Sequence, residues 1–334
     1  MKRLESHSTD PWPARAYGFV MQAVEPLFFA LQRRIGIKGM AYVFVAPNLI
    51  FFGLFVALPM ALNVWYALSG SNRLLIQERP FIGLDNFRDL LDCQSFLEVN
   101  SCRQDRFWRA VHNSVFFVAL QVSAMVLLSV MAALLLNGKI RGRGFFRAVF
   151  FFPVLLSPVV VALIWKWTLQ PDGLLNALIV WSGGERIAFL HNASWSFFWT
   201  VFVSVWSHMG FYTLILLAGL QAIPHELYEA AEIDGTSARR TFWRITMPLL
   251  LPTLLVVLIL SLIRGVQAFE EVFILTGGGP GTATQYIVQY IYETAFANQV
   301  HLLGLAAAAS LLVAVALMLL TLMQLRISYH GKDK

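Results

Sequence analysis

Charged residues are scarce in this sequence. Asp, Glu, Lys and Arg make up 13% of the 334 residues, whereas 58% are hydrophobic. Soluble domains carry about twice that share of charge, because a soluble chain of this length needs polar side chains to cover its core. The composition therefore argues against a large soluble fold and predicts a membrane protein.

Six long stretches contain no charged residue, and they lie between Lys38 and Arg73, Arg109 and Lys139, Arg147 and Lys166, Arg186 and Glu226, Arg244 and Arg264, and Glu293 and Arg326. Each is long enough to cross a bilayer, which takes about 20 residues, and none shows the polar stripe of an amphipathic helix. We predict an all-α integral membrane fold with six transmembrane helices. Their predicted ranges are Tyr42–Leu68, Asn113–Leu136, Val149–Leu169, Ser196–Leu220, Leu249–Phe269 and Leu302–Leu325.

Motifs of catalysis are missing as well. The sequence has no Walker A phosphate-binding loop, no HExxH and no GxSxG. Its seven histidines lack the spacing of metal ligands. We predict a non-catalytic chain that holds no metal or cofactor of its own.

Lys and Arg are distributed unevenly between the predicted loops. No basic residue occurs between Gly265 and Val300 on one side. Because basic loops stay cytoplasmic, we predict that both termini are cytoplasmic. This bias also explains the net charge of +6 without nucleic acid as a partner. The basic residues of the predicted inner side are Lys2, Arg3, Arg15, Arg33, Arg34, Lys38, Lys139, Arg141, Arg143, Arg147, Arg239, Arg240, Arg244, Arg326, Lys332 and Lys334.

The N-terminal segment does not look like a cleavable signal peptide. Its apolar stretch Tyr17–Leu31 is broken by Glu25 and Pro26, and no small-residue cleavage site follows. We expect residues 1–40 to be a cytoplasmic tail or an interfacial helix, and both interpretations stay open. Residues 41–326 are the predicted transmembrane domain, and residues 327–334 a cytoplasmic tail.

Cysteine occurs only twice, at Cys93 and Cys102, in the segment before the second predicted helix. That segment faces outward, where an oxidising compartment permits disulfides. We favour a disulfide over two free thiols. A metal site lacks further ligands nearby.

The most informative segment is the predicted inner loop 224–248. Pro224 suits a helix start, and Glu226 and Glu229 favour the positive end of the helix dipole. Gly235 suits a helix C-cap, and Thr236 or Ser237 could cap a second helix. The sequence thus predicts two short helices joined by a glycine turn.

Side chains of this loop suit contact with another protein. Ala230 and Ala231 are small and would leave one face flat. Five charged residues could set the register of docking, namely Glu229, Glu232, Asp234, Arg239 and Arg240.

The spacing from Glu229-Ala230-Ala231 through Gly235 to Ile245 resembles the EAA loop of ABC importer permeases. Met247-Pro248 stands where the family often has Leu-Pro, a substitution that keeps the apolar size. The resemblance implies that this loop is the coupling helix seated in a groove of an ATPase subunit. The implied coupling residues are Glu229, Ala230, Ala231, Asp234, Gly235, Arg239 and Arg240.

Further motifs resemble the sugar permeases, specifically the first of the two membrane subunits in maltose- and glycerol-3-phosphate-type importers. These motifs are Ala46-Pro47, Leu58-Pro59, Phe81–Phe87, Arg141–Phe146, Ser157-Pro158 with Trp165, and Leu275–Pro280. The resemblance implies a bacterial inner-membrane importer of a sugar or sugar derivative. It implies as partners a second homologous permease, two cytoplasmic ATPase subunits that bind ATP and Mg, and an extracytoplasmic solute-binding protein. An importer of a non-sugar solute, a stand-alone secondary transporter and a scaffold without a transport path remain alternatives.

Polar residues within spans are costly, so they are candidates for the solute pathway. Aromatic rings with hydrogen-bonding groups would suit a sugar. The candidates are Trp206, His208, Tyr212, Arg264, Gln267, Glu270 and Glu271. Packing is the alternative for Trp206 and His208, and pairing with Glu270 is the alternative for Arg264. Lys166 is expected to extend toward the interface, Arg141 and Arg143 to anchor the inner leaflet, and Thr276–Gly281 to form a turn.

Overall fold

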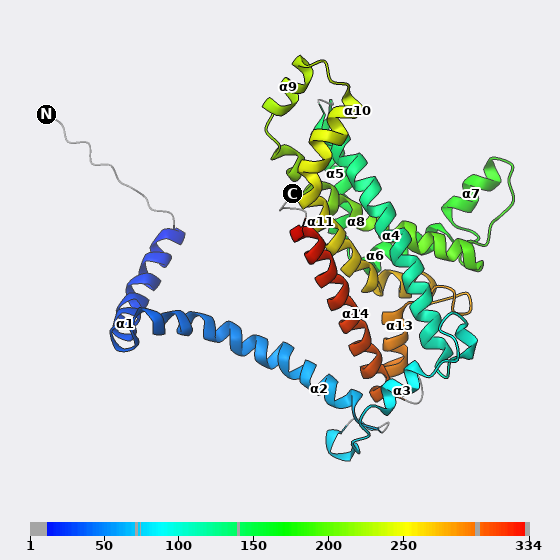
Figure 1. Cartoon of the computed structure of the whole chain (residues 1–334), viewed down its shortest axis with the longest axis horizontal. Coiled ribbons are helices and arrows are strands. Elements are labelled where there is room, and N and C mark those ends of the chain that lie inside the picture. The colour runs from blue at the N-terminus through cyan, green and yellow to red at the C-terminus, as the bar shows by residue number, and fades with distance from the viewer. Residues whose placement is uncertain (1–11, 71–72, 74, 139–140, 298–300, 331–334) are drawn as a thin grey trace. The chain divides into compact units, whose positions relative to one another are not determined.

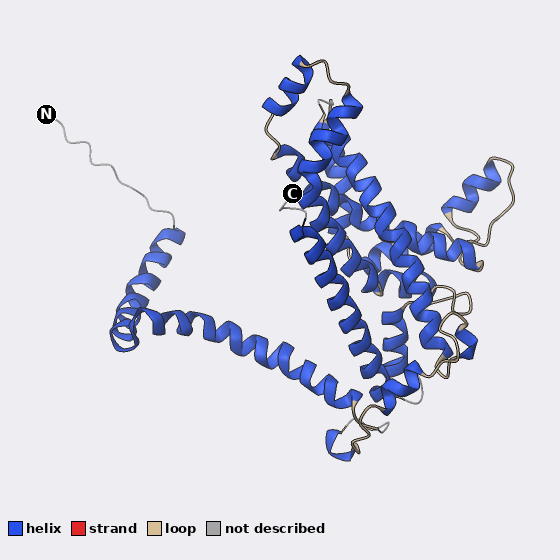
Figure 2. Cartoon of the chain, in the orientation of Figure 1, coloured by secondary structure: helices blue, strands red, loops and turns tan. Residues whose placement is uncertain are grey.

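A computed structural model describes residues 12–70, 73, 75–138, 141–297 and 301–330 (Figure 1). These residues form helices and loops, and across the described ranges the only β contacts are isolated bridges, Ser69 with Phe81 and Cys93 with Cys102 (Figure 2). The predicted all-α fold is confirmed for this part of the chain. The basic residues Lys2, Arg3, Lys139, Lys332 and Lys334 lie outside the described residues.

The chain divides into two units, residues 1–63 and 64–334, each described here by itself. The first contains α1 (Trp12–Phe52), a π-helical turn (Gly53–Ala57) and the start of α2 (Leu58–Ala67). Gly36 interrupts α1 with a φ of 72°, a conformation that glycine adopts without steric cost. The N-terminal segment is helical from Trp12 onward, and its position at the membrane interface stays a prediction. The apolar stretch Gln32–Ala67 is long enough to cross a membrane and begins earlier than predicted.

The second unit contains four long apolar helices: α4 (Asp105–Asn137), α8 (Ala193–Gln221), α11 (Met247–Val266) and α14 (Leu303–His330). α4 packs along α8 and α11 around a core that includes Met125, Leu216 and Leu250. The predicted spans two, four, five and six are confirmed as helices. α14 runs past Arg326, so the predicted C-terminal tail begins inside this helix.

The third predicted span is not one straight helix. α5 (Arg143–Phe151) continues into a 3₁₀ turn (Phe152–Leu155), and α6 (Pro158–Thr168) leaves at an angle of 100°. The prediction of a continuous helix over Val149–Leu169 is therefore wrong. Ser157 is extended, with ψ 139°, because the residue before a proline avoids the helical region. Pro158 then starts a new helix.

α5 and α8 approach each other at the backbone. A Cβ atom on Gly210 would lie 2.1 Å from the carbonyl oxygen of Phe150, so only glycine fits there. α5 therefore runs against α8 from Gly210 toward the end of α8 at Gln221. The loop after α6 carries α7 (Leu174–Trp181) and is held by the buried Asn176, whose Nδ2 donates to the carbonyls of Gln170 and Ile187.

The segment between α2 and α4 contains α3 (Asp85–Leu91) and two 3₁₀ turns (Ile76–Glu78, Val99–Ser101). The backbone turns at Gly83, with a φ of 64°, just before α3 begins. A disulfide joins Cys93 to Cys102, with an S–S distance of 2.01 Å. The structure thus has the bond that the sequence favoured over free thiols.

Two short helices separate α11 from α14. They are α12 (Glu270–Thr276) and α13 (Ile287–Tyr292), and a π-helical turn (Glu293–Ala297) follows α13. The glycine-rich loop between α12 and α13 is closed by Thr284, whose Oγ1 lies 2.7 Å from Oγ1 of Thr276 and donates to the carbonyl of Gly279 at 2.8 Å. The loop is a turn, as predicted, but it follows α12 and not the fifth span directly.

Candidate functional site

The predicted inner loop forms two short helices, α9 (Glu226–Ile233) and α10 (Ala238–Thr241). A π-helical turn (Phe242–Thr246) then joins α10 to α11. α9 and α10 lie at one end of the second unit, and α13 lies at the other end (Figure 1). Pro224 stands two residues ahead of α9, and its carbonyl accepts from the N–H of Leu227 at 3.3 Å.

Gly235 ends α9 in the way the sequence predicts. Its φ is 63°, which glycine tolerates and most residues do not. Its N–H donates to the carbonyl of Glu232 at 3.0 Å, and the N–H of Thr236 donates to that of Ala231 at 2.9 Å. This pair of bonds is a Schellman motif, which satisfies carbonyls at the helix end. Ser237 stands at the N-cap of α10, but its side chain caps no N–H.

The charged side chains of this loop point outward. His225 Nδ1 lies 3.0 Å from Oε1 of Glu229. Within the described ranges, no opposite charge lies within 4 Å of the four others, which are Glu232, Asp234, Arg239 and Arg240. Beside them the side chain of Ile233 is 87% exposed. This combination of unpaired charge and exposed apolar surface suits a protein contact.

Ala231 does not belong to that exposed surface. It is 7% exposed, whereas its neighbour Ala230 is exposed. The expectation that both alanines keep an outer face flat is corrected for Ala231, which packs inward. A cavity of about 390 Å³ lies between the loop and the start of α11, and its lining includes Leu227, Ala231 and Ile245.

The loop is attached to α11 by a side-chain contact. The hydroxyl of Tyr228 lies 3.1 Å from Oγ1 of Thr246, the last residue of the π-helical turn. α9 is therefore connected to α8 through the chain and to α11 through this bond.

A second polar cluster lies inside the bundle. Nε of Arg264, on α11, donates to Nε2 of His208, on α8, at 3.2 Å. Since Nε2 of this histidine accepts, Nδ1 carries the proton and donates to the carbonyl of Ser204 at 3.0 Å. Nη2 of Arg264 also lies 3.6 Å from Oε2 of Glu271, which is 2% exposed.

The structure corrects the predicted partner of Arg264. Glu270 is exposed, and the ion pair is made by Glu271. Glu271 was one of the predicted pathway candidates, but Glu270 was the predicted partner of Arg264. Both carboxylates follow the end of α11, so helical spacing gave no basis for choosing between them.

Gln121 is a polar residue that the sequence analysis missed. It is fully buried on α4, and within the described ranges its amide atoms have no hydrogen-bond partner. A Cβ on Gly265 would lie 2.7 Å from its Oε1. The only signal in the sequence is an uncharged glutamine inside an otherwise apolar run.

The fifth span is interrupted beside this cluster. α11 ends at Val266, and Phe269 has a φ of −144° before α12 starts at Glu270. Gln267 and Glu270 flank the break, and both are exposed. The break therefore brings the predicted residues Arg264, Gln267 and Glu270 into one short region.

Trp206 and Tyr212 have packing roles. The ring of Trp206 lies 5.5 Å from that of Trp165 at 81°, within an aromatic cluster that also contains Trp199. Tyr212 is 4% exposed in the core between α4, α8 and α11. Both side chains therefore contribute to packing, and their contact with a solute stays a prediction.

Lys166 does not extend toward the interface as expected. Its Nζ donates to the carbonyl of Ile274 at 2.9 Å, near the C-terminus of α12. A cation at a helix C-terminus is favourable, because the last carbonyls there lack helical partners.

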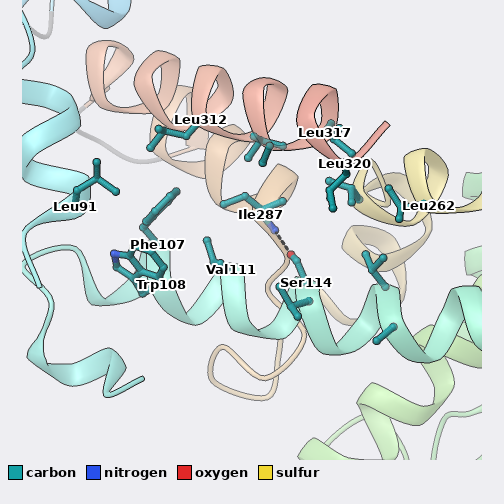
Figure 3. A pocket seen from close by; sticks show the side chains of 16 residues that line it. Leu91, Phe107, Trp108, Val111, Ser114, Leu262, Ile287, Leu312, Leu317 and Leu320 are labelled. Carbon is teal, nitrogen blue, oxygen red and sulfur yellow. Dashed lines mark hydrogen bonds between the residues drawn. The ribbon is translucent and has the colours of Figure 1, made fainter. Parts of the chain in front are cut away.

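A cavity with an apolar lining lies within the second unit. It has a volume of about 550 Å³ and lies between α4, α11, α13 and α14 (Figure 3). The hydroxyl of Ser114 in its wall already accepts from the N–H of Ile287 at 2.8 Å. Such a wall offers a sugar no hydrogen bonds, so this cavity does not suit a sugar pathway.

Within the described part of the chain, no group of three His, Cys, Asp or Glu residues could hold a metal ion.

Comparison with known proteins identifies the family. Residues 125–329, from α4 to α14, match the family described as "Binding-protein-dependent transport system inner membrane component". The chain belongs to this family. It is a multi-pass permease subunit of a binding-protein-dependent ABC transport system.

Individual relatives match over most of their length. The trehalose/maltose transport system permease protein MalF of Thermococcus litoralis is 35% identical over 297 residues, covering 88% of this chain and 95% of that protein. A probable ABC transporter permease protein of Bacillus subtilis, YurN, is 32% identical over 302 residues. That match covers 89% of this chain and 98% of YurN. A chain in the crystal structure of a bacterial alginate ABC transporter, complexed with an alginate pentasaccharide-bound periplasmic protein, superposes with a TM-score of 0.74. That chain is 25% identical, and the match covers 89% of this chain and 96% of that one.

Proposed function

We propose that this permease subunit imports a sugar or sugar derivative, forming half of the translocation pathway of an ATP-driven importer. The support is twofold. Similar permeases are named for trehalose and maltose, for multiple sugars and for arabinooligosaccharides. The structural neighbour belongs to a transporter of alginate, a polysaccharide.

The α9–α10 loop is the proposed contact for an ATPase subunit. The observation that carries this proposal is the exposed two-helix loop with charges that lack partners in the described residues, joined to α8 at one end and α11 at the other. A groove in a partner protein would supply the opposite charges. In this arrangement the loop is cytoplasmic, and so are both termini.

The proposed assembly contains two ATPase subunits that bind ATP and Mg, a second homologous permease and an extracytoplasmic solute-binding protein. ATP binding would move the α9–α10 loop, and α8 and α11 would follow because they are attached to it. Such a switch requires ATP to stabilise the outward-open state more than the inward-open state.

The break between α11 and α12 is the proposed contact with solute. Irregular backbone inside a membrane is tolerated where it is buried in protein or lines a water-filled cavity, and broken helices carry the binding sites of many transporters. Gln267 and Glu270 would bind sugar hydroxyls there, and His208 and Glu271 would hold Arg264 in place.

Reconstitution into proteoliposomes tests this function. The chain is purified with its second permease and ATPase subunits, and the cognate binding protein is loaded with the sugar that calorimetry shows it binds. We expect uptake and ATP hydrolysis that both require the binding protein. Uptake that persists without the ATPase subunits would instead indicate a secondary transporter. A binding protein that binds only a non-sugar solute would overturn the sugar assignment and leave the importer intact.

A further inference from the structure

Two arginines of α5 converge on one neutral side chain. The amide oxygen of Gln221 accepts from Nη2 of Arg143 at 2.9 Å and from Nη2 of Arg147 at 3.0 Å. The opposite orientation would set the amide NH₂ against two guanidinium groups, so the oxygen faces them. Two positive charges therefore share a single uncharged acceptor.

This pair lacks the carboxylate partner that several other arginines of the chain have. Arg88, Arg103 and Arg186 each lie within 3.2 Å of a carboxylate. No carboxylate of the described residues lies within 4 Å of Arg143 or Arg147. The Nε atoms of both are buried, and neither donates to a described residue. Repulsion between the two charges is stronger at such a site than in water, so an anion would be favoured there.

The position of the pair is at the end of the spans. Gln221 is the last residue of α8, and α4 ends at Asn137, six residues before Arg143. Arg147 stands one turn further along α5 and still reaches Gln221, so both guanidinium groups lie at the level where α8 ends. α5, α9 and α10 lie toward the same end of the second unit (Figure 1).

The other side of α5 is apolar and open. Phe145 is 70% exposed, Phe146 45% and Val149 51%. A helix that combines arginines with exposed aromatic side chains at a membrane boundary suits the zone between headgroups and acyl chains.

We propose that Arg143, Arg147 and Gln221 form a binding site for the phosphate of an anionic phospholipid. Guanidinium groups bind phosphate oxygens through paired, charge-assisted hydrogen bonds, and clustered basic residues bind anionic headgroups. The acyl chains would lie along Phe145 and Val149. Assignment of the site to the cytoplasmic leaflet rests on the proposed function, since the α9–α10 loop at the same end sets the orientation.

Lipid retention tests the site. The assembled transporter, purified with its partner subunits, is exchanged into nanodiscs of phosphatidylglycerol and phosphatidylcholine, and retained lipid is counted by native mass spectrometry. Loss of one charged hydrogen-bonding partner should weaken phosphatidylglycerol retention roughly tenfold in Arg143→Gln and in Arg147→Gln. The matched control is Arg186→Gln, since Arg186 is an exposed arginine in the α7 segment; it should retain lipid like the native chain.

A second variant separates lipid loss from misfolding. Gln221→Glu places a carboxylate between the two arginines and should displace the lipid about as strongly, while the melting temperature of the complex stays the same or rises. Inorganic phosphate at millimolar concentration should not displace the lipid, because it lacks the acyl chains.

Three results would overturn the proposal. One is equal retention of phosphatidylglycerol in all these variants, and another is equal retention of phosphatidylcholine by the native chain. The third is a loss of ATPase co-purification in the arginine variants with lipid retention unchanged, which would assign the pair to a protein partner. Each of these readouts is independent of sugar uptake, so failure of the proposed transport function would be seen separately.

Discussion

The α9–α10 loop and the break between α11 and α12 both contain charged residues, but these residues differ in exposure and in pairing. In the loop, Glu232, Asp234 and Arg240 are exposed, and in the described part of the chain they have no charged partner. At the break, Glu271 is 2% exposed and is paired with Arg264.

This difference follows from the solvent of each region. Water stabilises the exposed charges of the loop until a partner covers them, at little cost to the isolated chain. A charge buried inside the bundle has no such stabilisation and must be compensated within the fold. Unpaired surface charge therefore leaves the loop available to a partner protein, whereas paired buried charge fixes an internal geometry.

The largest effect is expected from Gly235→Pro. Proline requires a φ near −65° and lacks the N–H that Gly235 donates to Glu232, so the loop should lose about 3 kcal/mol or more. We expect ATP-driven uptake in proteoliposomes to fall about 100-fold, with membrane insertion intact.

Gly183→Pro is the matched control for that substitution. Gly183 has a φ of 88° and donates its N–H to Val180 at 3.0 Å, but it lies in the α7 segment. Equal loss of uptake in both variants would mean that proline strain, and not the α9–α10 loop, explains the effect.

Glu271→Leu should destabilise the protein by about 3 kcal/mol, because it leaves Arg264 without its buried counter-charge. The melting temperature of the detergent-solubilised complex measures this. The double variant Arg264→Met with Glu271→Leu should recover most of the loss. Glu270→Leu should leave stability unchanged, and a drop as large as that of Glu271→Leu would contradict the pairing in the structure.

Glu229→Lys reverses one charge of the loop without changing buried contacts. Repulsion across a partner surface should weaken binding of the ATPase subunit about tenfold, measured by co-purification at low salt. Glu185→Lys, an exposed reversal in the α7 segment, should bind the ATPase normally. Unchanged ATPase binding in Glu229→Lys would remove this residue from the contact.

The smallest effect is expected from Gln267→Ala at the break. Loss of one neutral hydrogen bond to a sugar is worth about 1 kcal/mol, so half-saturating solute concentration should rise about fivefold in transport assays. Gln170→Ala is the control, since this exposed residue uses only its backbone carbonyl in the fold. Native uptake in Gln267→Ala would place the solute pathway elsewhere.

Hydropathy predicted where the chain crosses the membrane but not the shape of each crossing. Charge-free runs were sufficient to place α4, α8, α11 and α14. The run from Val149 to Leu169 is equally apolar, yet Ser157 before Pro158 bends it by 100°. The length of an apolar run indicates only whether its side chains favour lipid over water. A bend in the helix does not change that preference, so hydropathy cannot reveal it.

Local rules also predicted the loop well, because its geometry depends on local backbone preferences. The Schellman motif at Gly235 needs only residues 231–236. The polar cluster was harder to predict, since Arg264 and His208 are 56 positions apart and only tertiary packing joins them. Helical spacing does not extend beyond the end of α11, which is why Glu270 and not Glu271 was predicted as the partner of Arg264.

The seven residues of α12 are held at both ends by long side chains from different helices. Arg264 of α11 pairs with Glu271 in its first turn at 3.6 Å, and Lys166 of α6 donates to the carbonyl of Ile274 near its last turn at 2.9 Å. If α6 and α11 separate during a transport cycle, at least one of these two contacts must break. The order in which these two contacts break would then decide whether α12 moves with α6 or stays with α11.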